Sequence, residues 1–174
     1  EIIEDVKNFR SEIGVLFLNS YNRDVLTKMF DDNRLTYTSL FKARPHIFVS
    51  KSNPLAKHEV VSLEDLEDFP YLSYDQGIHN SFYYSEEILS QIPHKKSIVV
   101  SDRATLFNLL IGLDGYTIAT GILNSNLNGD NIVSIPLDID DEIDIVYLKH
   151  EKATLSKMGE KFLDNLVKEV TFDN

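Results

Sequence analysis

The spacing of apolar residues along the chain predicts an alternation of strands and helices. Short β-type runs predict strands at 14–18, 35–40, 46–50, 71–74, 97–100, 116–120, 132–135 and 143–148. Apolar residues three or four positions apart predict helices at 2–10, 24–30, 62–66, 81–92, 102–112 and 156–170. The run 14–18 is apolar throughout, as expected of a strand covered on both faces.

The stretch from 97 to 121 forms one predicted unit of strand, helix and strand. Such a unit builds a parallel sheet, and ligands gather at the carboxyl ends of parallel strands. Ser101 and Thr120 stand at two of these ends. The helix start between them carries about half a positive charge. The unit therefore predicts a site for a small molecule with a carboxylate or another anionic group. The alternative is that Ser101 or Asp102 only caps the helix.

Composition excludes several classes of protein. The chain has 174 residues, 43% of them hydrophobic, enough for one large domain or two small lobes. Its net charge of -11 argues against DNA or RNA binding by this chain alone. The absence of cysteine excludes disulfides and fits a reducing cytosol. No apolar run approaches the roughly 18 residues of a membrane span, and the acidic first ten residues are unlike a signal peptide. Those residues indicate a chain that begins inside a fold.

No motif points to catalysis or to a metal. The five histidines lack metal-ligand spacing, and there is no GxSxG elbow, P-loop or GxGxxG fingerprint. The asparagines of 124–129 imitate half of a calcium loop, but the bidentate acid would fall on Ile135. The acidic run 138–144 is interpreted as a solvated hairpin turn, and neighbouring Glu86 and Glu87 would not face one site on a helix. We expect no enzyme, no metal and no cofactor.

Several stretches together resemble the effector-binding domain of LysR-type transcriptional regulators. The most specific are PHIFVSKSNPLA at 45–56 and SLEDLEDFPYLSYDQG at 62–77. Four further stretches follow the family's order along the chain: SEIGVLFLN (11–19), SDRATLFNLLIG (101–112), YTIATGI (116–122) and LSKMGEKFLDNLVKE (155–169). The stretches SDRATL and YTIATGIL are most similar to regulators from Firmicutes that control sulfur amino-acid or related metabolic genes.

The resemblance implies an α/β fold of the periplasmic-binding-protein type 2, with two Rossmann-like lobes and a cleft between them. The chain would cross between lobes near Ser50–Lys51 and Lys149–His150. Lobe one would then be 1–50 plus 151–174, and lobe two would be 51–150. The family's N-terminal winged helix-turn-helix, its linker helix and the first strand, helix and strand of lobe one are absent. Lobe one is therefore expected to be incomplete.

The resemblance also implies a set of ligand-binding residues in the cleft. Carried over by position, they are Asn19, Arg44, Tyr74, Ser101, Asp102, Thr120 and Gly121. Arg44 would pair with an anion near the hinge, or else be exposed to solvent. Asp102 would repel a bare anion, so a zwitterion such as an amino-acid derivative is the expected effector.

The function implied is that of a cytoplasmic ligand-sensing domain without membrane contact. It would form a homodimer or homotetramer, and it would reach DNA only through the absent N-terminal domain. Genes of sulfur amino-acid metabolism are the expected targets. One alternative is the solute-binding protein of a transporter, for which the missing secretion signal is unfavourable. A second is an enzyme on the same fold, for which no catalytic group can be named.

Overall fold

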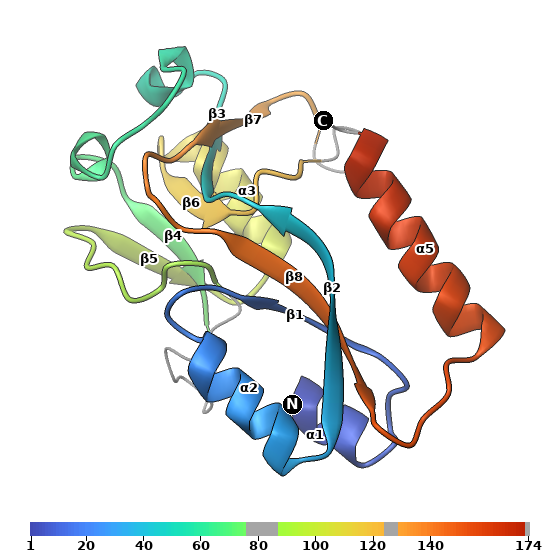
Figure 1. Cartoon of the computed structure of the whole chain (residues 1–174). Helices are drawn as coiled ribbons and strands as arrows, with labels where there is room; N and C mark the ends of the chain where they lie inside the picture. The colour runs from blue at the N-terminus through green and yellow to red at the C-terminus, as the bar shows by residue number, and fades with distance from the viewer. Residues whose placement is uncertain (76–86, 124–128, 173–174) are drawn as a thin grey trace. The chain divides into compact units, whose positions relative to one another are not determined.

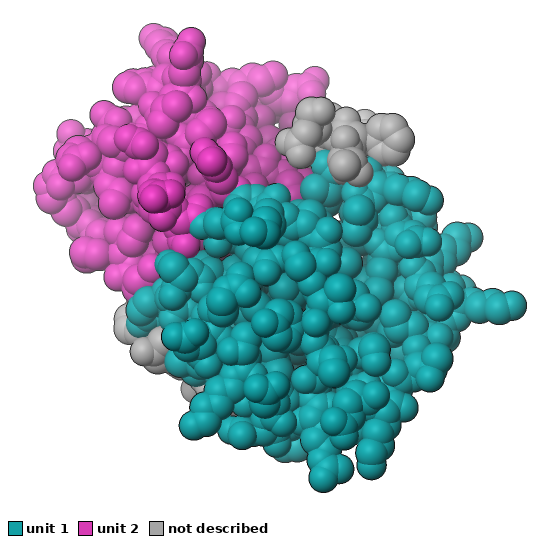
Figure 2. Space-filling model, viewed as in Figure 1, with its two compact units in different colours: residues 1–43, 142–174 teal, residues 44–141 magenta. Residues whose placement is uncertain are grey.

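The structure, a computed structural model, divides into two compact units (Figure 2). Each unit has its own sheet. Unit 1 comprises residues 1–43 and 142–174, and unit 2 comprises residues 44–141. Residues 1–75, 87–123 and 129–172 are described. None of the helices in these ranges is long and apolar enough to span a membrane.

Unit 1 is built on a three-stranded antiparallel sheet in the order β1–β8–β2 (Figure 1). Its strands are β1 (Gly14–Leu18), β2 (Leu35–Ala43) and β8 (Ile143–His150), and its helices are α1 (Ile2–Lys7), α2 (Arg23–Asp32) and α5 (Lys157–Phe172). Apolar side chains of α1, α2 and one sheet face form its core: Val6, Leu18, Leu26, Phe30, Leu35, Val146 and Leu148. Helices α1 and α2 are therefore stabilised because each buries apolar side chains against the sheet.

Two expectations about unit 1 need correction. The strand β1 is not covered on both faces, because Val15, Leu16 and Phe17 are only half-buried and β1 is an edge strand with one neighbour. The strand β2 extends to Ala43, beyond the predicted 35–40, with an irregularity in its pairing between Ser39 and Phe41. A bulge of this kind lets a strand continue past a break in its alternation.

Unit 2 is built on a five-stranded mixed sheet in the order β5–β4–β6–β3–β7. The strands are β3 (His46–Ser50), β4 (Tyr71–Tyr74), β5 (Ser97–Val100), β6 (Tyr116–Ala119) and β7 (Ile132–Pro136); the helices are α3 (Arg103–Gly112) and the short η1 (Pro54–Lys57) and η2 (Glu64–Leu66). Strands β5 and β6 both pair parallel to β4, and α3 connects them. The predicted unit of strand, helix and strand is confirmed, with β4 inserted between its two strands.

The core of unit 2 lies between α3 and the sheet. Its buried residues are Phe48, Leu72, Val100, Leu106, Leu110 and Ile132. Around the start of η2, Ser62 and Asp65 exchange two hydrogen bonds: Asp65 Oδ2 accepts from Ser62 N at 2.9 Å, and Ser62 Oγ accepts from Asp65 N at 3.3 Å. Of the predicted helix 81–92, residues 81–86 lie outside the described part, and 87–92 form turns and bends. The calcium-like segment 124–129 also lies outside it, except for Gly129.

The unit boundaries fall at 43/44 and 141/142, earlier than the crossings expected near Ser50–Lys51 and Lys149–His150. Strand pairing is the reason. The strand β3 pairs with β6 and β7, so it belongs to unit 2, whereas β8 pairs with β1 and β2, so it belongs to unit 1. The acidic run 138–144 is consequently no hairpin turn, since β7 and β8 belong to different sheets.

Candidate functional site

Three predicted site residues lie together at the carboxyl edge of the unit 2 sheet. The parallel strands β4, β5 and β6 start level with one another, since Tyr71 pairs with both Ser97 and Tyr116. Each of the three has four residues, so they also end together. At these ends are the predicted residues Tyr74, Ser101 and Thr120. We call this set the carboxyl-edge site.

Asp102, and not Ser101, is the N-cap of α3. Its backbone is extended, with φ -150° and ψ 156°, and its Oδ1 accepts from the Thr105 N–H at 2.9 Å. Its Oδ2 accepts from Thr105 Oγ1 at 2.7 Å. The backbone N–H of Thr105, followed by the hydroxyl, lowers the pKa of Asp102, so the helix start carries an ionised carboxylate.

Ser101 is exposed, and its hydroxyl has no hydrogen-bond partner among the described residues. It is therefore available to a ligand, while its neighbour caps the helix. Next along the chain, the Arg103 guanidinium lies over the Phe107 ring at 4.9 Å. This arginine was not predicted, although it stands beside the helix start that the sequence indicated.

The Thr120–Gly121 turn packs closely on His46, which the sequence reasoning missed. Gly121 has φ +84°, a conformation that favours glycine, and a Cβ there would lie 2.5 Å from His46 Nδ1. His46 is the first residue of β3 and pairs with Ala119, the last residue of β6. Its Nδ1 also lies 2.9 Å from the carbonyl oxygen of Arg44. His46 reaches this turn because β3 pairs antiparallel with β6, and the sequence around Gly121 does not indicate that pairing.

Arg44 and Tyr74 differ in how firmly the structure holds them. Arg44 is exposed, and its guanidinium has no ion-pair partner among the described residues. The backbone N–H of Tyr74 donates to Glu87 Oε1 at 2.5 Å, and the Tyr71 hydroxyl donates to Glu87 Oε2 at 3.4 Å. Glu87 thus holds the first and the last residue of β4, a role that its sequence position did not indicate.

Asn19, the predicted residue in unit 1, closes the turn between β1 and α2. It is 3% exposed, and its Oδ1 accepts from the N–H groups of Tyr21 at 3.1 Å and Asn22 at 3.0 Å. In return, its own N–H donates to Asn22 Oδ1 at 2.9 Å. The side-chain oxygen is committed to the turn, so a ligand contact of Asn19 would have to use its Nδ2 group.

A partly buried ion pair lies next to that turn. Asp144 pairs with Leu18 across β1 and β8, on the sheet face that α2 covers. Its Oδ2 lies 3.1 Å from Arg23 Nη2, and its Oδ1 accepts from Ser39 Oγ at 2.5 Å. Asp144 was predicted to be part of a solvated turn, but it is only 6% exposed.

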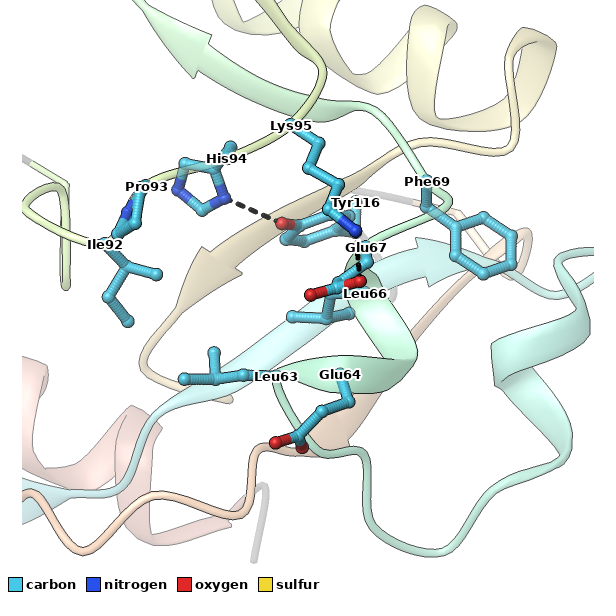
Figure 3. A pocket seen from close by; sticks show the side chains of 10 residues that line it. All are labelled: Leu63, Glu64, Leu66, Glu67, Phe69, Ile92, Pro93, His94, Lys95 and Tyr116. Carbon is cyan, nitrogen blue, oxygen red and sulfur yellow. Dashed lines mark hydrogen bonds and ion pairs between the residues drawn. The ribbon is translucent and has the colours of Figure 1, made fainter.

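Unit 2 also contains a pocket of about 410 Å³ (Figure 3). It lies where the parallel strands β4, β5 and β6 begin, at the other end of these strands from the carboxyl-edge site. Its lining includes Tyr116, the first residue of β6, and segments that precede β4 and β5. In it, His94 Nδ1 lies 2.8 Å from the Tyr116 hydroxyl, and the His94 ring stacks on Tyr71 with centroids 3.8 Å apart. We call it the amino-edge pocket. No sequence pattern predicted it.

Burial shifts the titration of the aromatic groups around this pocket. It lowers the pKa of His94, so the imidazole is neutral at pH 7, and it raises the pKa of Tyr116 to about 12. Over the described ranges, no three His, Asp or Glu side chains are grouped closely enough to hold a metal ion.

Comparison with known proteins gives one family. Residues 1–171 match the family described as LysR substrate binding domain. A comparison with curated proteins finds no match.

Solved structures of several regulators share the fold. HinK, a LysR family transcriptional regulator from Pseudomonas aeruginosa, superposes with a TM-score of 0.64 at 15% identity, over 97% of this chain and 56% of HinK. The effector binding domain of QuiR in complex with shikimate superposes with a TM-score of 0.61 at 18% identity, over 98% of this chain and 77% of the QuiR domain. The C-terminal domain of a LysR family regulator from Rhodococcus sp. RHA1 superposes with a TM-score of 0.63 at 14% identity, over 95% of this chain and 78% of that domain. At these identities the matches show the fold, and the chain spans about half the length of HinK.

Proposed function

Because the chain belongs to the LysR substrate-binding domain family, we propose that it is the ligand-sensing domain of a LysR-type transcriptional regulator. The carboxyl-edge site carries this proposal. Three parallel strands end there side by side, beside a helix start, with an exposed hydroxyl on Ser101. Sheets of this kind meet their ligands at this edge.

The chemistry of the carboxyl-edge site favours a small zwitterion. Ser101 and Thr120 offer hydroxyls that can donate to a carboxylate, and Arg103, two residues after Ser101, adds a positive charge to the first turn of α3. The ionised Asp102 opposes a bare anion but accepts from an ammonium group. An amino-acid-like effector satisfies both. The QuiR complex with shikimate supports a small organic effector in this family.

The other residues of the proposed site are those that the family resemblance gives by position. Asn19 and Arg44 would contribute from unit 1 and from the start of unit 2, and Tyr74 and Gly121 from the edge of the unit 2 sheet. An effector that prefers one arrangement of the units would shift their population. In a homodimer or homotetramer, that shift would reach DNA-binding domains outside this chain, in the cytoplasm. The net charge of -11 supports a chain that does not itself hold DNA.

The alternatives have less support. A solute-binding protein of a transporter would share the fold, but the family match favours a regulator. An enzyme would need a catalytic group, and neither the sequence motifs nor the family match supplies one. Control of sulfur amino-acid genes and an origin in Firmicutes rest only on the resemblance of the stretches SDRATL and YTIATGIL.

The test begins with a thermal-shift panel of small carboxylates and amino acids, and each stabilising compound is then titrated by calorimetry. Ser101→Ala should weaken binding roughly tenfold or more, because a hydrogen bond to a charged group contributes about 1.5–3 kcal/mol. Ser97→Ala, an exposed serine at the other end of β5, is the matched control and should bind as the parent does. Equal affinities of the parent and Ser101→Ala would refute the site.

A further inference from the structure

The amino-edge pocket is separate from the carboxyl-edge site. Tyr116 lines the pocket, and Thr120 lies four residues further along the same chain, just past the end of β6. At about 3.3 Å per residue in a strand, this distance is roughly 13 Å. A small molecule cannot occupy both places, so the pocket needs its own explanation.

The walls of the pocket are mainly apolar. Leu63 and Leu66 contribute from the η2 segment, with Phe69 after it, and Ile92 contributes from the segment before β5 (Figure 3). Leu63 is 38% exposed, so part of this apolar surface faces solvent. A volume of about 410 Å³ lies within the range of small-molecule sites.

The pocket lining carries more negative than positive charge. Its lining contains two carboxylates, Glu64 and Glu67, and one ammonium group, Lys95. Lys95 forms an ion pair with Glu67, which raises the pKa of the lysine. The Glu64 carboxylate has no partner among the described residues. His94 is neutral at pH 7, so it does not offset this carboxylate.

The polar and aromatic groups complete a site for a cation. Glu64 offers a carboxylate to a cation, in a lining that also contains the aromatic side chains of Tyr116 and Phe69. His94 Nε2 is buried and has no hydrogen-bond partner among the described residues, since Nδ1 is the nitrogen that meets Tyr116. An anion would gain little, because the single lysine is already paired and an unpaired carboxylate lies nearby.

We propose that the amino-edge pocket binds a small organic cation, an ammonium group carried on an apolar or aromatic body. The apolar walls bury the body, and Glu64 receives the ammonium group at the rim. The pocket is thus a second ligand site of unit 2, distinct in place and in charge preference from the carboxyl-edge site.

Three probes of matched shape test the charge preference on the 174-residue chain: 2-phenylethylammonium, 2-phenylethanol and 3-phenylpropionate. Each is titrated by NMR, following the amides of Leu66, His94 and Lys95. The ammonium probe should bind at least about twofold to fivefold more tightly than the alcohol, as expected for an exposed ion pair, and the carboxylate more weakly than both. Equal or tighter binding of the alcohol or the carboxylate would overturn the proposal.

Two variants locate the interaction. Glu64→Gln should reduce the affinity for the ammonium probe about twofold to fivefold and leave the affinity for the alcohol unchanged. Glu59→Gln, an exposed glutamate outside the lining, should change neither. Both are surface positions, so thermal melting should show intact folds. An ammonium affinity that Glu64→Gln leaves unchanged would show that the cation does not use this pocket.

Discussion

Replacing Arg23 with methionine should lower the free energy of unfolding by about 1–3 kcal/mol, between the values for exposed and fully buried pairs. Methionine keeps the length of the aliphatic chain and the helix propensity but removes the charge. The Asp144 side chain is 8% exposed, so the change leaves a buried carboxylate with Ser39 as its main partner. The Arg23 side chain is 39% exposed, which keeps the loss below that of a fully buried pair, about 3–5 kcal/mol.

Urea unfolding of a double-mutant cycle measures this loss. The variants are Arg23→Met, Asp144→Asn and the combination, and the cycle isolates the pairwise energy. Arg10→Met is the control, because Arg10 pairs with Asp5 at 2.7 Å but the two side chains are 63% and 32% exposed. Arg10→Met should lower the free energy of unfolding by about 1 kcal/mol or less. A loss for Arg23→Met no larger than for Arg10→Met would refute the view that Asp144 is a buried charge that needs its partner.

Three further predictions concern unit 2. Gly121→Ala should cost about 1–2 kcal/mol or more in urea unfolding, because of its positive φ and the contact with His46; an unchanged midpoint would contradict this. The pKa of Asp102 is lowered on folding, so its stabilisation is present above about pH 4 and is lost as the pH falls through the lowered value; in acid melts Asp102→Asn should lack this loss. Burial also lowers the pKa of His94, so stability should be full above about pH 6.5 and decline below it; melting curves of His94→Asn that run parallel to the parent's from pH 7.5 to 5 would count against this.

Local patterns were enough for much of the fold. The strands at 14–18, 46–50 and 97–100 have the bounds that their apolar runs predicted, because turn residues follow each run. Helix α3 ends at Gly112 as predicted, and only the choice between Ser101 and Asp102 as its cap needed coordinates. That choice depends on backbone angles at two adjacent residues, which the sequence does not distinguish.

Strand pairing between distant segments accounts for the errors. Both β3 and β8 were correctly predicted as strands. The strand β3 was expected in lobe one but belongs to the sheet of unit 2, and β8 was expected in lobe two but belongs to the sheet of unit 1. The same pairing buries Asp144 and brings His46 to Gly121. The amino-edge pocket also depends on segments that meet only in three dimensions. None of these contacts has a local sequence signal.

The central claim is that the effector contacts the carboxyl edge of unit 2. Amide chemical shifts of the 174-residue chain, titrated with the stabilising compound from the thermal-shift panel, test it most directly. The account predicts that the largest changes lie at Ser101, the start of α3 and Thr120–Gly121, with little change at Lys95. Largest changes at Lys95 and His94, with Ser101 and Thr120 unmoved, would contradict it.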